Sequence, residues 1–349
     1  MEPAAGVPYY LLIVASPEEI PFEFQYSLDT FWAVGRLSFD TPDEYRKYAE
    51  SVVRYESAPE VSQSRNIALF APEHDFDAAT QSFTKNVANV FCDPAQRRGP
   101  LGSGQKFGLL PFLGPAATKS GLRTILRGAL PSGPPAVLFT GSHGLEVPPD
   151  SAVQSERQGA LVCDDWKGYG SVGPDDYFAA SDVPSDARIH GLIHFFFACY
   201  GAGYPRHDDF SRGSPQRRVI AKQAAVSRLP QTMLGRENGA LACLGHVERA
   251  WSYSFLNSRG DSQAADFRGV IAGILLGKRI GSATDQFNLR WAVLSAELLE
   301  CLEEAGHGTV KSPNEIAGRW VARNDARNYI VLGDPAVRLR VSDLTGAAA

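Results

Sequence analysis

The chain has 349 residues, a formal net charge of −5 and five cysteines. Hydrophobic residues make up 44% and charged residues 21%, which is ordinary for a soluble globular protein of one large or two smaller α/β domains. Lysine and arginine do not cluster, which disfavours nucleic-acid binding. No apolar run reaches the roughly 18 residues of a membrane helix, and the amino terminus lacks signal-peptide features. We therefore expect a cytoplasmic protein without a membrane partner.

The cysteines are scattered along the chain, and none belongs to a CxxC pair. This pattern disfavours both a disulfide framework and a structural zinc site. We expect no metal and no other cofactor, and we expect Cys163, Cys243 and Cys301 to be buried as small apolar residues.

Strands and helices are predicted to alternate in the first part of the chain. The apolar run at residues 9–15 predicts a buried strand, and Thr41-Pro42 is typical of a helix start. The predicted elements are a strand at 9–15, a helix at 44–57, a strand at 66–71, helices at 77–90 and 117–129, and a strand at 136–140. Residues 93–104 are rich in Pro, Gly and Arg, and they predict a boundary between a smaller α/β subdomain (1–104) and a larger catalytic subdomain (105–349).

The second part of the chain continues the alternation. The predicted elements are strands at 192–199, 239–245 and 329–332 and helices at 218–234, 264–276 and 287–305. Long irregular segments at 145–184 and 201–215 separate some of them. Apolar strands alternating with amphipathic helices indicate a largely parallel sheet covered on both faces.

Two of these strands end in residues that can form a nucleophile–base pair. His143 follows the strand at 136–140, and Cys199 ends the strand at 192–199. In open α/β sheets, ligands bind at the carboxyl ends of the strands. A thiol needs a nearby base to become a thiolate, and imidazole is the usual partner. The backbone N–H groups of Gly144 and Cys199 are the candidate donors of an oxyanion hole.

A strand ending in His-Gly, followed about 50 residues later by a strand ending in Ala-Cys, resembles the caspase-type peptidases. The fuller resemblance is to the gingipain-like peptidases and the related CHAT domains, which are cysteine peptidases of clan CD and of bacterial type. Three segments carry it: LLIVASPEEIP at 11–21, LACLGHVERAWSYSF at 241–255 and YIVLGDPAVRL at 329–339.

The resemblance implies a caspase-like three-layer α/β/α sandwich, with His143 as general base and acid and Cys199 as nucleophile. It also makes Trp251 a wall of the S1 pocket, the pocket that receives the P1 side chain of the substrate. Acidic residues that would select a basic P1 side chain are chosen on charge alone. They are Asp164, Asp165, Asp208, Asp209 and Glu248.

The sequence therefore predicts a cysteine endopeptidase whose partner is a peptide or protein substrate. Two alternatives stay open at this point. One is a catalytically silent caspase-fold module that binds a peptide or acts as a regulatory scaffold. The other is a latent peptidase that an activating protein or a signalling molecule switches on, because long irregular segments are where switchable order resides.

Overall fold

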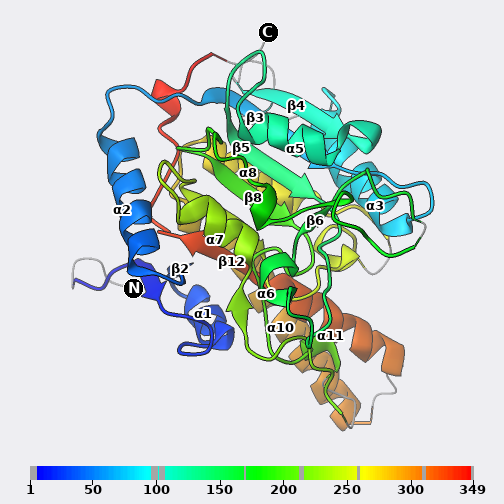
Figure 1. Cartoon of the computed structure of the whole chain (residues 1–349). Helices are drawn as coiled ribbons and strands as arrows, with labels where there is room; N and C mark the ends of the chain where they lie inside the picture. Colours follow the sequence, from blue (N-terminus) through cyan, green and yellow to red (C-terminus); the bar gives the residue numbers. More distant parts are fainter. Residues whose placement is uncertain are drawn as a thin grey trace.

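The computed structural model describes residues 6–95, 101, 107–168, 170–211, 216–257, 260–308 and 312–346. An eight-stranded sheet with the order β1-β2-β12-β11-β8-β5-β3-β4 forms its centre (Figure 1). The strands are β1 (Tyr10–Val14), β2 (Ala33–Leu37), β3 (Ser64–Ala71), β4 (Gly108–Leu113), β5 (Pro135–Gly141), β8 (Ile193–Phe197), β11 (Ala242–His246) and β12 (Tyr329–Gly333). Within this eight-stranded sheet only the β11–β12 pair is antiparallel, so five parallel strands from β11 to β4 adjoin a block of three that runs the opposite way.

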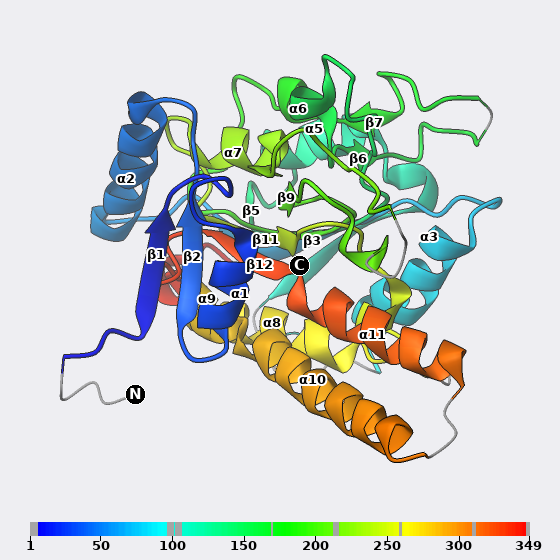
Figure 2. The same ribbon diagram turned by 90° about the horizontal axis from the view of Figure 1, so that it is seen from below.

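Helices cover both faces of this sheet (Figure 2). One face carries α2 (Pro42–Ser57), α5 (Lys119–Leu126) and α7 (Arg228–Leu234), and the other carries α8 (Ala265–Leu275), α9 (Ile280–Ala283) and α10 (Asp285–Gly306). The remaining α-helices of the described residues are α1 (Phe22–Asp29), α3 (Ala78–Phe83), α4 (Asn89–Cys92), α6 (Gln154–Arg157) and α11 (Pro313–Arg327). The prediction of a mostly parallel three-layer α/β/α sandwich is confirmed.

The central strand β8 shows why its sequence is apolar on both sides. The ring of Phe195 stacks on that of Phe139 in β5, with 4.7 Å between the ring centroids, and its centroid lies 5.6 Å from that of Phe267 in α8. The preceding residue, His194, points to the opposite face, where its Nδ1 atom lies 3.4 Å from the sulfur of Met233 in α7. Successive side chains of a strand alternate between faces, so a strand that is buried on both faces reads as a continuous apolar run.

The predicted division at residue 104 cuts across this sheet. Strands from both sides of it pair with each other, and β3 lies between β4 and β5. Residue 104 itself lies outside the described residues, so the exact boundary stays a prediction. Within the described ranges, no helix combines the length and the apolar composition that crossing a bilayer needs.

One predicted helix was largely wrong. Residues 218–234 were expected to be helical, but only Arg228–Leu234 is. The preceding segment is extended because its backbone pairs with the loop after β8: the N–H of Ile220 donates to the carbonyl of Arg206. Further along, β10 (Ala225–Val226) pairs with β9 (Gly203–Tyr204). Tertiary pairing overrides local helix preference here.

Some elements have no counterpart in the sequence prediction. They are α1, β2, β4, α6, α9, α11, the short pair β9 and β10, and the short pair β6 (Leu161–Val162) and β7 (Tyr177–Phe178), which orders part of the long segment 145–184. Of the predicted boundary loop 93–104, residues 96–100 and 102–104 lie outside the described residues.

Candidate active site

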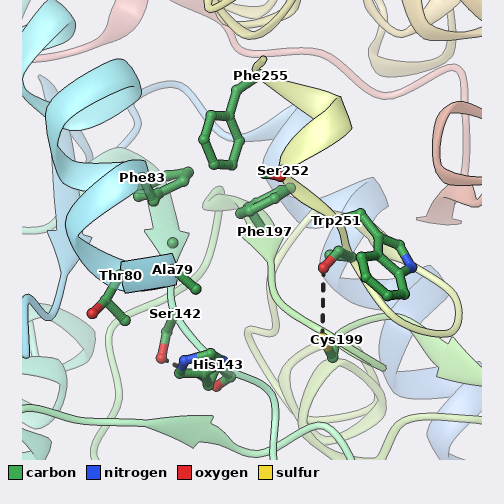
Figure 3. Close-up of a pocket in the computed structure, with 12 residues that line it drawn as sticks. Ala79, Thr80, Phe83, Ser142, His143, Phe197, Cys199, Trp251, Ser252 and Phe255 are labelled. Carbon is green, nitrogen blue, oxygen red and sulfur yellow. Dashed lines mark hydrogen bonds between the residues drawn. The ribbon is translucent and has the colours of Figure 1, made fainter. Parts of the chain in front are cut away.

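His143 and Cys199 emerge side by side from the sheet. Strands β5 and β8 are parallel neighbours, and Gly141 pairs with Phe197 at their carboxyl ends. His143 and Cys199 each stand two residues beyond that last pair. The two segments therefore leave the sheet at the same edge, with His143 and Cys199 the same number of residues beyond it. Figure 3 shows both side chains along one side of a single pocket.

The backbone of Gly144 lies directly against that of Cys199. A Cβ atom placed on Gly144 would lie 1.7 Å from the carbonyl oxygen of Cys199. Any side chain at this position would push the His143 loop away from the cysteine, so the glycine is required by close approach rather than by an unusual φ angle. The structure thus brings together the two segments that the sequence analysis paired.

Asp77 contacts His143 and was not identified from the sequence. Its Oδ2 atom lies 2.7 Å from Nε2 of His143. The same carboxylate caps the amino end of α3, where it accepts hydrogen bonds from the N–H groups of Ala79 at 3.4 Å and Thr80 at 3.0 Å. Burial raises the pKa of Asp77, but the Thr80 N–H and His143 outweigh it, so that the pKa falls below its ordinary value.

The Asp77 side chain is therefore held from two directions, by a helix terminus and by the imidazole. The sequence signal was present, because Asp77 opens a predicted helix shortly after a predicted strand. An N-cap pattern alone points to a helix start, and only the order of strands in the sheet places that helix start beside His143.

The thiol of Cys199 is protonated in this arrangement. Its Sγ lies 3.8 Å from the carbonyl oxygen of Ala250, to which it donates. Burial raises the pKa of this thiol to about 11, and the positive charge of Arg249 opposes the rise. Within the described part of the chain, no hydrogen bond joins the thiol to His143.

The residue after the cysteine turns the chain sharply. Tyr200 is fully buried and has a φ of 58°, in the left-handed region that residues other than glycine seldom adopt. Its N–H donates to the carbonyl oxygen of Glu248 at 2.6 Å. Ser227 also donates from its hydroxyl to the Tyr200 carbonyl. These bonds fix the turn that presents Cys199 at the sheet edge.

The pocket beside Cys199 has an empty volume of about 470 Å³, part of it open to solvent. Trp251, which was expected to form a wall of the S1 pocket, is one of the residues that line this pocket. The full lining is Ala79, Thr80, Phe83, Gly141, Ser142, His143, Phe197, Cys199, Ala250, Trp251, Ser252 and Phe255.

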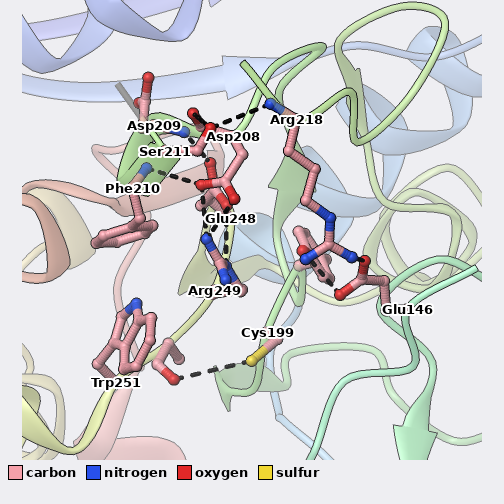
Figure 4. A network of polar contacts seen from close by, with 12 residues as sticks. Glu146, Cys199, Asp208, Asp209, Phe210, Ser211, Arg218, Glu248, Arg249 and Trp251 are labelled. Carbon is pink, nitrogen blue, oxygen red and sulfur yellow. Dashed lines mark hydrogen bonds and ion pairs between the residues drawn. The ribbon is translucent and has the colours of Figure 1, made fainter. Parts of the chain in front are cut away.

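Three of the acids proposed for substrate selection form a separate polar network (Figure 4). Asp208 pairs with Arg249 at 2.6 Å, and Asp209 pairs with Arg327 at 2.5 Å. Glu248 is buried and accepts the N–H of Asp209 at 2.9 Å. Burial raises the pKa of Glu248 to about 7. None of the three lines the pocket.

The other two proposed acids lie near the start of α5. Asp164 pairs with Lys167 at 3.3 Å, and Asp165 accepts the backbone N–H of Lys119 at 2.7 Å. They do not line the pocket either. The remaining predicted apolar cysteines, Cys163, Cys243 and Cys301, are buried as expected. Among the residues that the structure describes, no three His, Cys, Asp or Glu side chains are grouped to hold a metal ion.

Comparison with known proteins gives a family and a fold. The model of a family described as "Peptidase family C25" matches residues 30–340. A solved structure described as "Structure of Protease" superimposes with a TM-score of 0.51 at 15% sequence identity, which indicates a similar fold. The match covers 96% of this chain and 65% of that one, so the chain spans about two thirds of its length. No curated protein matches.

Proposed function

The chain belongs to peptidase family C25, a family of cysteine peptidases, and from this premise we propose that it is an endopeptidase with Cys199 as nucleophile and His143 as general base. Its sheet and covering helices are those of the caspase-like fold. The observation that carries the proposal is the matched position of the two residues. Each stands two residues beyond paired ends of neighbouring strands, and both line one pocket.

In each half of the reaction, His143 accepts one proton and later gives one proton away. His143 takes the thiol proton as Sγ attacks the carbonyl carbon of the scissile bond. The imidazolium then gives that proton to the leaving amine as the C–N bond breaks, which leaves an acyl-enzyme. Water, deprotonated by His143, then attacks the thioester carbonyl carbon; the C–S bond breaks, the acid is released, and the imidazolium returns the proton to Sγ.

The N–H groups of Gly144 and Cys199 are the proposed donors to the oxyanion. Within the described residues, neither N–H donates to another protein group. The close packing of Gly144 on Cys199 also keeps the two backbones together. Two such donors stabilise the tetrahedral intermediate, and each is worth about 3 kcal/mol.

Asp77 is the proposed positioning residue for His143. Its carboxylate fixes the orientation of the imidazole and stabilises the imidazolium that forms during thiol attack. This role rests on the 2.7 Å contact between Oδ2 of Asp77 and Nε2 of His143 alone. It extends the expected Cys–His pair to a set of three residues.

We further propose that the resting enzyme is latent. A thiol with a pKa of about 11 that donates to Ala250 must turn toward His143 before it can react. Bound substrate, or an activating protein or signal, would supply that rearrangement. The basic P1 preference and the cytoplasmic location expected from the sequence stay predictions. The silent scaffold stays the rival function.

Labelling with an acyloxymethyl-ketone peptide probe tests the proposed peptidase function. Wild type is expected to react, whereas Cys199→Ala and His143→Ala are expected to lose labelling. Cys301→Ala removes a buried cysteine of α10 outside the site and serves as the control. Wild type that resists probes with basic, acidic and apolar P1 groups, and that cleaves no peptide, would favour the silent scaffold or a peptidase that needs an activating partner.

A further inference from the structure

The pocket beside Cys199 is lined chiefly by apolar side chains. We propose that this pocket is the S1 site and that it selects a large apolar P1 residue such as Leu, Met or Phe. The proposal rests on the peptidase function above and names its substrate class. It departs from the basic P1 side chain that the acidic candidates of the sequence would select.

The position of the pocket makes it the site for P1. The carbon attacked by Sγ belongs to the P1 residue, whose side chain branches from the adjacent Cα atom. The nearest cavity to the nucleophile therefore receives that side chain. The pocket meets this condition, since Cys199, His143 and the segment 250–252 all line it.

Three phenylalanine rings close the end of the pocket away from His143 and Cys199 (Figure 3). Phe83 stacks on Phe197 with a centroid distance of 5.2 Å. Phe255 meets Phe83 at 5.7 Å and Phe197 at 5.6 Å, edge to face in both cases. Phe83 also occupies the space above Gly141, where a Cβ atom would lie 1.9 Å from its ring. A side chain that enters the pocket thus ends against aromatic surface.

Basic side chains would find no counter-charge there. No Asp or Glu appears in the lining. Asp77, two residues before the lining residue Ala79, is bound to His143 and the α3 amino end. Asp325 accepts from the N–H of Trp251 at 2.9 Å and from the hydroxyl of Ser254 at 2.7 Å, and it lies 3.1 Å from His246.

The two hydroxyls on the α3 and β5 sides are also engaged. Thr80 donates to the carbonyl of Asp77 at 3.1 Å and accepts from the N–H of His74 at 3.1 Å. Ser142 donates to the carbonyl of Val162. Burying an unpaired lysine or arginine charge against such a surface is unfavourable, whereas an apolar side chain gains from leaving water.

Helix α3 offers a way to reverse the preference. Ala79 lines the pocket at the second position of this helix, and its neighbour Ala78 does not. Both are exposed. Ala79→Asp places a carboxylate at the pocket near a helix amino terminus, which favours negative charge. Ala78→Asp adds the same charge to the same helix turn outside the pocket and is the matched control.

The test measures kcat/KM on peptides that differ only at P1. We expect Leu, Met or Phe to exceed Arg and Lys at least tenfold. Ala79→Asp should reduce that ratio at least tenfold, and Ala78→Asp should leave it within about twofold. A wild type that prefers Arg or Lys would overturn the apolar assignment and leave the peptidase function standing.

Binding to the Cys199→Ala variant gives a readout that needs no turnover. Calorimetry should show the Leu peptide binding at least tenfold more tightly than the Arg peptide. Absence of catalysis together with this preference would support the apolar pocket and would count against a peptidase that its substrate alone activates. Equal binding, tighter binding of the Arg peptide, or no binding of either would refute the pocket assignment itself.

Discussion

Replacing Asp77 by Asn separates two roles of one carboxylate. Asparagine still caps a helix, so the amino end of α3 should persist. What is lost is the negative charge 2.7 Å from Nε2 of His143. Hydrogen bonds to charged groups contribute about 1.5–3 kcal/mol. The lower end of that range applies because the side chains of His143 and Asp77 are 36% and 22% exposed.

A loss of about 1.5–2 kcal/mol from the transition state lowers kcat/KM roughly ten- to thirtyfold. The assay is hydrolysis of a fluorogenic peptide under conditions where the wild type is active, with thermal unfolding measured in parallel. Asp77→Asn should unfold within a degree or two of wild type. Asp77→Ala also removes the cap and should lose about 1 kcal/mol of stability in addition to activity.

The pair of variants makes the reasoning refutable. Asp77→Asn with wild-type kcat/KM would show that the carboxylate does not act through His143. Equal losses of stability in both variants would show that Asn fails to cap α3, and the activity loss could then not be assigned to the missing charge.

Three further predictions concern the same edge of the sheet. Gly144→Ala should lower kcat/KM about a hundredfold or more, because its Cβ would lie 1.7 Å from the Cys199 carbonyl oxygen; near-normal turnover would contradict this. Alkylation of resting Cys199 by iodoacetamide, followed by mass spectrometry, should rise with pH to a midpoint near 11, whereas a midpoint near 7 would reveal a resting thiolate. Burial raises the pKa of Glu248 from 4.5 to about 7, so its contribution to stability is full below about pH 4.5 and is lost as the pH rises through about 7. Denaturant unfolding of Glu248→Gln should show a pH dependence flatter by on the order of 1–3 kcal/mol across this window, and an unchanged dependence would contradict the shift.

The proximity of His143 and Cys199 could be predicted because its signal is local. A buried strand is a continuous apolar run, and both His143 and Cys199 directly follow such runs. The glycine at 144 belongs to the same local His-Gly pattern, and the structure adds that its backbone approaches Cys199 too closely for a side chain. Recognising the pattern does not need the order of the strands.

The acids show where local signals end. Charge alone suggested Asp208, Asp209 and Glu248, yet the first two are paired with arginines and the third is buried in the same network. Residues 327 and 209 are far apart in the chain, so their pairing cannot be seen without the fold. The edge strand β4 and the helix α11 were missed for a related reason, because half-buried elements carry weak apolar periodicity.

The parallel block of the sheet explains why the site has the members it has. Strands β3, β5, β8 and β11 lie in chain order across the sheet and all end at one edge. The residues beyond those ends touch in the same order. Asp77 bonds His143, Gly144 packs on Cys199, and Cys199 donates to Ala250. The neighbour of β11 on the other side in the sheet is β12, which is antiparallel to it. The carboxyl end of β12 therefore lies at the opposite edge. The row of contacts therefore stops at β11, and the segment after that strand, which carries Trp251, forms the last wall of the pocket.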